Sequence, residues 1–161
     1  MKYKNALCIH PQRKEISDIG IVPPLGLEHI ASAMKDFVER ITIIDMRFEK
    51  DALAFIDKTT DLICISINWW HEEKEVKELI NSLPKNITTI AGGRYATENV
   101  DVFLNDCPNI NIIVRGDGEE IIRDILQDKP LSEITGISYR KNGSVIHNTP
   151  RSLSRVMDNI Y

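Results

Sequence analysis

The sequence predicts an α/β fold in which a parallel sheet of five strands is covered by helices on both faces. Five short apolar runs alternate with five segments of helical periodicity along the first 130 residues. Such alternation is typical of βαβ units, whose crossover connections make neighbouring strands parallel. After Pro130 the pattern changes, and two short runs flank Asn142-Gly143, the preferred dipeptide of a type I′ turn. These runs predict a small antiparallel hairpin appended to the sheet.

The five expected strands are rich in β-branched residues, and each is followed by polar residues, proline or glycine. The third contains Leu-Ile-Cys-Ile-Ser-Ile, a nearly continuous apolar run that is typical of a central strand buried on both faces. We place the strands at residues 5–9, 41–44, 61–68, 87–91 and 110–114.

The segments between the strands repeat apolar residues at helical spacing. Pro23-Pro24 opens the first helix, because proline fits a first helical turn. The second is expected at about 51–58, the third ends at Pro84, and the fourth is expected at about 97–105. The apolar residues of the five helices are, in chain order, Leu27, Ile30, Met34 and Val38; Leu53 and Ile56; Val76, Leu79, Ile80 and Leu83; Val100, Phe103 and Leu104; and Ile121, Ile122, Ile125 and Leu126.

Length and composition indicate one ordinary globular domain with a small appendage, since 42% of the 161 residues are hydrophobic and 27% are charged. We expect residues 1–130 to form the α/β domain, 131–149 the hairpin and 150–161 a linker. The formal net charge is -4 with no basic block, which gives nucleic-acid binding no electrostatic support. The widely spaced Cys8, Cys64 and Cys107 are expected to be buried thiols in a reducing cytoplasm. No apolar run is long enough for a membrane span.

Several familiar site signatures are absent. The first strand is not followed by Gly-x-Gly-x-x-Gly, and Gly-x-x-x-x-Gly-Lys-Ser/Thr occurs nowhere. Without a glycine loop, Asp45 is better interpreted as a helix cap or salt-bridge partner than as a ribose ligand. His10 ends the first strand and could face a ligand, although a hydrogen-bonded strand-end histidine is the commoner case. The histidines and cysteines have no metal-ligand spacing, so no catalytic and no metal-binding residue is expected.

Four clusters instead follow strands one, three, four and five, at residues 24–27, 66–70, 92–97 and 115–120. Parallel strands share their carboxyl ends, so these clusters should lie on one edge of the sheet, where open α/β sheets bind ligands. Gly92-Gly93 is the central one, because glycine allows positive φ and lets a bulky group approach the backbone closely. Each cluster alone also fits a simple turn or a helix N-terminus, whereas together they predict one broad ligand site.

Four motifs, in order and covering nearly the whole chain, resemble the cobalamin-binding domains that precede radical SAM domains. Pro-Pro-Leu-Gly-Leu-Glu-His-Ile-Ala at 23–31 is similar to that family's "PPLGLxxIA". The segments 92–97, 115–120 and 136–143 are similar to its "GGPHAT", "RGEGEE" and "GISYRxxG". Relatives in that family include methyltransferases and the anaerobic Mg-protoporphyrin IX monomethyl ester oxidative cyclase.

The resemblance implies a flavodoxin-like, Rossmann-type sheet that holds a corrinoid across its carboxyl edge. It also implies that the nucleotide tail of cobalamin enters a groove flanked by the glycines after the fourth strand. Together with the strand-end clusters, it indicates cofactor-binding roles for Leu25, Gly26, Ser66, Trp69, Gly92, Gly93, Tyr95, Thr97, Gly116 and Glu119.

The chain departs from this family's patterns at three places. Arg94-Tyr95 replace a Pro-His pair. Corrinoid carriers that bind cobalt through histidine have Asp-x-His-x-x-Gly after the first strand, where this chain has Glu15-x-Ser17-x-x-Gly20, so no histidine ligand is expected from this loop. Cys-x-x-x-Cys-x-x-Cys is absent, so S-adenosylmethionine and a 4Fe-4S cluster would belong to a radical SAM domain beyond Tyr161 or on another chain.

On this interpretation the chain alone binds a corrinoid and does not turn over, while its parent is an oxidative cyclase or methyltransferase. Two alternatives share the fold and lack a corrinoid, because a fold does not fix a function. One is a flavin-binding or response-regulator-like domain, and the other is an interaction domain without a ligand. A phosphoacceptor module would need an acidic pair near the end of the first strand, where this chain has His10-Pro11.

Overall fold

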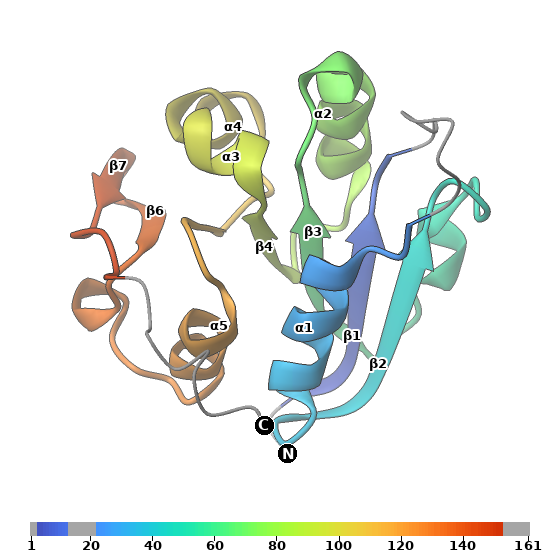
Figure 1. Ribbon diagram of the computed structural model, residues 1–161, viewed down its shortest axis with the longest axis horizontal. Helices are drawn as coiled ribbons and strands as arrows, with labels where there is room; N and C mark the ends of the chain where they lie inside the picture. The colour runs from blue at the N-terminus through green and yellow to red at the C-terminus, as the bar shows by residue number, and fades with distance from the viewer. Residues whose placement is uncertain (1–2, 13–21, 153–161) are drawn as a thin grey trace.

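The computed structural model describes residues 3–12 and 22–152 and has three layers (Figure 1). A seven-stranded sheet forms the middle layer, in the order β2-β1-β3-β4-β5-β6-β7. Its strands are β1 (Tyr3–His10), β2 (Val38–Asp45), β3 (Thr60–Ser66), β4 (Thr88–Gly92), β5 (Ile112–Val114), β6 (Ile137–Lys141) and β7 (Ser144–His147). The first five are parallel and have the 2-1-3-4-5 order of a flavodoxin-like sheet, so the predicted fold class is confirmed.

Helices cover both faces of this sheet (Figure 1). Two of them, α1 (Leu25–Met34) and α5 (Glu119–Leu126), pack against each other on one face. The other face is covered by the 3₁₀ turn η1 (Ala52–Phe55), α2 (Glu73–Ser82), α3 (Arg94–Glu98) and α4 (Val100–Asp106). Two shorter 3₁₀ turns, η2 (Trp70–Glu72) and η3 (Leu131–Glu133), precede α2 and β6. Each face therefore encloses its own apolar core.

The expected hairpin is present, and it extends the main sheet. Asn142 and Gly143 have φ of 52° and 80°, the positive values that a type I′ turn requires. Strand β6 pairs antiparallel with β5, Ile113 lying opposite Ser138. The residues after position 152, which belong to the expected linker, lie outside the described residues.

Three elements differ from the sequence expectations. Val38 begins β2, opposite Tyr3 in β1, so it is not the last residue of the first helical stripe. The expected helix at 51–58 is only the short turn η1, in which Ala52 is buried and Leu53 is 37% exposed. The turn is short for a local reason: the Asp51 side chain accepts from the N–H of Leu53 at its start, and Ile56 already has an extended backbone at its end.

The helix expected at 97–105 begins earlier and is divided into two. It starts at Arg94, directly after Gly93, and breaks at Asn99, where φ is -128° and ψ is 40°. The carbonyl of Tyr95 accepts the helical hydrogen bond from the N–H of Asn99 at 3.1 Å and a second one from the Asn99 side-chain amide at 3.0 Å. This local side-chain bond accompanies the break in the helix.

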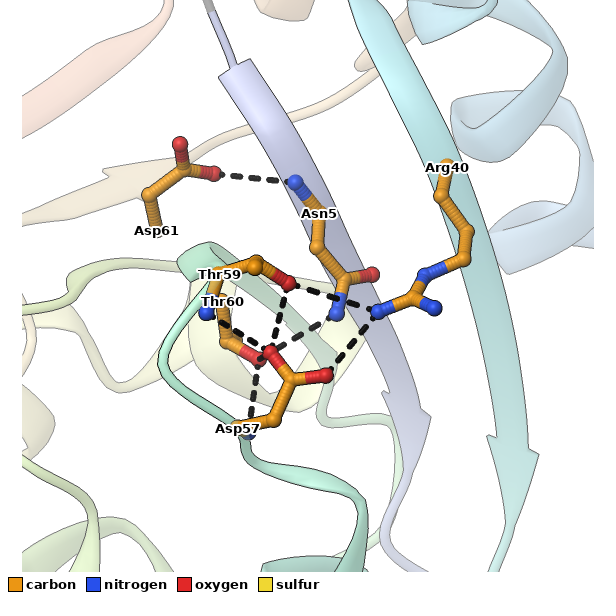
Figure 2. A network of polar contacts seen from close by, with 6 residues as sticks. All are labelled: Asn5, Arg40, Asp57, Thr59, Thr60 and Asp61. Atoms are coloured by element: carbon orange, nitrogen blue, oxygen red, sulfur yellow. Dashed lines mark hydrogen bonds and ion pairs between the residues drawn. The ribbon is translucent and has the colours of Figure 1, made fainter.

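A polar network fixes the amino ends of β1, β2 and β3, far from the ligand edge (Figure 2). The Asp57 carboxylate accepts hydrogen bonds from the N–H of Thr59 at 2.7 Å and from the Arg40 guanidinium at 3.0 Å. Thr60 Oγ1 accepts from the side-chain amide of Asn5 at 3.2 Å. The hydrogen bonds from Thr59, followed by the Arg40 contact, lower the pKa of Asp57 to about 2. These contacts join the starts of the three strands to one another.

Candidate functional site

A cavity of about 590 Å³ opens at the carboxyl ends of the parallel strands. Residues at the ends of β1, β3, β4 and β5 line it, together with the first turns of α1 and α5. The chain passes from β1 to β2 on one side of β1 and then crosses to β3 on the other side. The topological switch point therefore lies between β1 and β3. Ligands of open α/β sheets bind at such a point. The four sequence clusters therefore meet at one opening, as predicted.

The turn after β4 is built on the end of β3. Gly93 has φ of 98°, and a Cβ atom there would lie 2.6 Å from the Ile67 carbonyl oxygen. That carbonyl accepts from the N–H groups of Tyr95 and Ala96 at 3.0 and 3.2 Å. Asn68 accepts from the N–H of Arg94 at 3.0 Å. Gly93 is thus required by the turn itself, quite apart from any ligand.

Two other glycines leave room in the cavity wall. A Cβ at Gly92 would make only ordinary contacts, 3.6 Å from the Val114 carbonyl oxygen, and a Cβ at Gly26 would meet nothing within 4 Å. Gly118, in contrast, lies under α1, because a Cβ there would be 2.7 Å from Cδ1 of Ile30. The absence of a side chain at Gly92 and Gly26 therefore keeps space open, whereas at Gly118 it lets α1 and α5 approach each other.

One end of the cavity is polar and lies beside β1 and β2. Its residues include His10, Gln12 and Arg47. The Asp45 carboxylate accepts hydrogen bonds from Nε and Nη2 of the Arg47 guanidinium, so the interpretation of Asp45 as a salt-bridge partner is confirmed. Burial lowers the pKa of His10, which favours the neutral ring, and its Nδ1 has no hydrogen-bond partner among the residues that the structure describes.

The other end is an apolar slot between the sheet and the helices α1 and α5. Six cavity-lining residues also belong to, or pack against, the core on that face. We call these six residues the slot: Leu27, Ile30, Cys64, Ile90, Val114 and Ile122.

Large apolar side chains surround the opening. Leu25 is 54% exposed, Trp69 is 45% exposed, and both line the cavity. Trp70 is 72% exposed and stacks edge-on against His71. Exposed aromatic residues beside a cavity are typical of a surface that a ligand or a partner covers.

Eight of the ten cofactor-binding residues expected from the sequence line this cavity: Leu25, Gly26, Ser66, Trp69, Gly92, Gly93, Gly116 and Glu119. Tyr95 and Thr97 do not. The Tyr95 hydroxyl donates to Glu73 of α2, and Thr97 Oγ1 donates to the Gly93 carbonyl at 2.9 Å. Both hydroxyls thus hold the turn after β4 in place. The segment Glu15–Gly20, in which no histidine ligand is expected, lies outside the described residues.

Sequence reasoning missed most of the slot. Ile30 and Ile122 carried a signal, since both were assigned to apolar helical stripes, but periodicity cannot distinguish a core contact from a cavity wall. Asn68 lies within the predicted cluster 66–70 but was not singled out, and Arg47 lies in none of the four clusters. Among residues 3–12 and 22–152, no helix is long and apolar enough to cross a membrane, and no cluster of three or more histidine, cysteine or acidic residues could hold a metal ion.

No family model matches the sequence, but several known proteins are similar to it. An uncharacterized methyltransferase of Pyrococcus horikoshii is 26% identical over 156 residues, covering 86% of this chain and 32% of the relative. The anaerobic magnesium-protoporphyrin IX monomethyl ester cyclase of Synechocystis is 23% identical over 151 residues, covering 85% and 30%. A cobalamin-dependent radical SAM methyltransferase of Streptomyces tokunonensis is 24% identical over 106 residues, covering 61% and 16%.

The chain is similar in sequence to enzymes of the cobalamin-dependent radical SAM class. It spans about a third or less of the length of these curated relatives.

Two solved structures of that enzyme class share its fold. TsrM of Kitasatospora setae, with cobalamin and a [4Fe-4S] cluster bound, superimposes with a TM-score of 0.70 at 17% identity, over 94% of this chain and 30% of TsrM. OxsB, with aqua-cobalamin and S-adenosylmethionine bound, superimposes with a TM-score of 0.72 at 22% identity, over 94% of this chain and 22% of OxsB.

Proposed function

We propose that this chain is the corrinoid-binding domain of a cobalamin-dependent radical SAM enzyme. The observation that carries the proposal is the cavity at the carboxyl edge of the sheet, which gathers eight of the ten residues expected to bind the cofactor. The common fold and the sequence similarity to enzymes of this class support it.

The shape and chemistry of the cavity fit cobalamin. The whole cofactor is larger than the cavity, so only a part of it can enter. Its nucleotide ends in a flat heterocyclic base, which matches the apolar slot between α1 and α5. The corrin ring is broad and carries amide side chains, which matches an open rim with both apolar and polar groups. We therefore infer that the base enters the slot and the ring lies over the strand ends.

Particular residues would make the contacts at the rim. Ser66 Oγ accepts from Asn68 at 2.9 Å, so its own proton remains to be donated to a corrin amide carbonyl. The Glu119 carboxylate, 3.4 Å from His29, can accept from an amide N–H. Leu25 and Trp69 offer apolar surface to the ring. Gly26, Gly92 and Gly116 admit the cofactor close to the backbone.

Bound cobalamin would supply methyl transfer or electron transfer at cobalt, while this chain binds, orients and shields the cofactor. The chain alone should bind without turnover. We propose that S-adenosylmethionine and a 4Fe-4S cluster are held by a radical SAM domain beyond Tyr161, and that the parent is a cytoplasmic methyltransferase or oxidative cyclase. A response-regulator-like role is not favoured, because β1 ends in His10-Pro11 and Asp45 is held by Arg47.

Titration of the purified chain with hydroxocobalamin tests the proposal. We expect saturable changes in the corrin absorption bands and co-elution of the corrinoid with the protein on gel filtration. Absence of both at millimolar protein would overturn the proposal for this domain. Flavin mononucleotide in a parallel titration serves as the control, and saturable flavin binding in place of corrinoid binding would support the flavodoxin-like alternative.

A further inference from the structure

The two ends of the cavity differ sharply in polarity. Among its described lining residues, the polar side chains outside the slot are His10, Gln12, Arg47, Ser66, Asn68, Asp117 and Glu119. All of these lie at or after the end of a strand, or at the start of α5. The slot, in contrast, is lined by five hydrocarbon side chains and one thiol.

The thiol of Cys64 lies beside two other sulfur-containing residues. Cys64 Sγ lies 3.8 Å from Sδ of Met34, and Cys8 lies opposite Cys64 in the neighbouring strand. A hydrogen bond with Cys8 and burial raise the pKa of Cys64 well above its ordinary value, so it stays a neutral thiol. A neutral, engaged thiol behaves as a small hydrophobic group and offers little to a polar ligand.

The backbone of the slot floor is also saturated. Ile90 lies in β4 between Cys64 of β3 and Ile112 of β5, with parallel ladders on both sides. Carbonyl and N–H groups in such a central strand are used by the sheet. A ligand inserted between α1 and the sheet therefore meets hydrocarbon and sulfur, with few groups that could replace lost hydrogen bonds to water.

We propose that the slot selects corrinoids by their lower base, favouring an apolar benzimidazole over a purine. The inference rests on the proposed function, because it requires that the base enters the slot. Adenine carries an exocyclic amine and ring nitrogens that would be desolvated there without partners, and burying a polar group without a partner is costly. The two methyl groups of dimethylbenzimidazole add apolar area that the slot can bury.

Equilibrium dialysis of the chain against three corrinoids tests this selection. They are cyanocobalamin, its analogue with adenine as the lower base, and dicyanocobinamide, which has no base. All three are dialysed in excess cyanide, which replaces the lower base on cobalt and leaves the base free to enter the slot. We expect the adenine analogue to bind about tenfold or more weakly than cyanocobalamin, the factor that one unpaired buried polar group produces. Cobinamide should also bind at least about tenfold more weakly, because no apolar base is buried.

Each outcome separates the selection from the underlying function. Equal affinity for all three corrinoids would overturn the selection and leave corrinoid binding intact. Preference for the adenine analogue would overturn it as well. If none of the three binds, the proposed function fails and the selection fails with it.

A variant pair adds a second, independent measurement. Val114→Thr places a hydroxyl in the slot with nearly the same side-chain shape, and this hydroxyl can pair with the polar groups of adenine. The dissociation constant of the adenine analogue divided by that of cyanocobalamin should therefore fall at least about threefold. Val100→Thr makes the same change at a residue of similar burial, in the core on the opposite face, and should leave the ratio unchanged. An unchanged ratio in folded Val114→Thr would contradict the proposal, and the wild-type comparison stands even if that variant does not fold.

Discussion

The carbonyl oxygen of Ile67 lies 2.6 Å from the point that a Cβ atom on Gly93 would occupy. The end of β3 and the turn after β4 are thus fitted to each other, and the adjacent Gly92 is left to face the cavity. Two glycines that look equivalent in the sequence therefore have different roles, and substitutions can separate them.

Gly93→Ala should destabilise the fold. The change forces a side chain into a φ of 98° and into the Ile67 backbone, so we expect a loss of about 2–4 kcal/mol in the free energy of unfolding. Urea denaturation followed by circular dichroism measures it. Gly143, with a similar φ of 80° but open space around it, is the matched control: Gly143→Ala should cost only about 1 kcal/mol. Equal costs at the two positions would show that φ alone, and not the Ile67 contact, makes Gly93 necessary.

Gly92→Leu should weaken corrinoid binding while the protein stays folded. Along β4, Ile90 belongs to the core on the α1 and α5 face, so alternation directs a side chain at position 92 to the same side. A leucine there would fill the slot entrance, and we expect the dissociation constant for hydroxocobalamin to rise at least about tenfold. Gly92→Ala, whose Cβ would make only ordinary contacts, should have a smaller effect. Undiminished affinity of Gly92→Leu would exclude this entrance as the path of the ligand.

Tyr95→Phe tests whether the hydroxyl serves the cofactor or the fold. The Tyr95 hydroxyl donates to Glu73, which also pairs with Lys77, and its ring packs edge-on against Phe103. We expect stability to fall by about 1 kcal/mol, because a hydrogen bond to a partly exposed carboxylate is lost. Cobalamin affinity should change less than about twofold, since Tyr95 is not a cavity-lining residue. A larger loss of affinity would restore Tyr95 to the binding site.

Arg140→Met should reduce stability without altering binding. The Arg140 guanidinium donates to the carbonyls of Leu104, Cys107 and Ile110, at 2.8 Å for Cys107 and 2.6 Å for Ile110, and so closes the end of α4. Methionine removes the Arg140 donor from all three carbonyls, and of them the Cys107 carbonyl keeps a hydrogen bond from the N–H of Ile110. We expect a cost of about 2 kcal/mol. Thermal unfolding measures the cost, and hydroxocobalamin titration at a temperature where the variant is folded should match wild type.

Asp57 should make the protein sensitive to acid. Its pKa in the folded state is lowered to about 2 from 3.8, so its contribution to stability is complete above about pH 4 and is lost as the pH falls toward 2. Urea unfolding of Asp57→Asn should therefore differ from wild type at pH 5 and converge with it near pH 2. Parallel curves over that range would contradict the expected linkage.

Much of the fold follows from local patterns in the sequence. The β-branched runs identify five strands, and Asn142-Gly143 identifies the hairpin, because both signals depend on neighbouring residues alone. Errors arise where tertiary contacts override the pattern. Val38 has helical spacing from Met34, yet pairing with Tyr3 places it in a strand. Leu53 fits a helical stripe, yet the cap at Asp51 and the extended Ile56 leave only one turn.

The site was predictable at the level of loops and less so at the level of side chains. Parallel topology alone brings the strand-end clusters together, which is why eight expected residues line the cavity. The direction of a side chain depends on where its helix starts. Because α3 begins at Arg94, the Tyr95 hydroxyl points to α2 and away from the opening. The slot depends on how closely α1 and α5 pack, and that spacing is set by Gly118 against Ile30, a contact between distant segments.

The two helical walls of the slot, Leu25–Met34 and Glu119–Leu126, come from opposite ends of the described chain. During synthesis the ribosome must therefore release nearly the whole domain before a pocket for the base exists. A corrinoid present in the cell cannot be captured by the emerging N-terminal half. Once bound, it joins the first helix to the last, so its binding energy should oppose unfolding of the domain as a whole, and not only of a local loop.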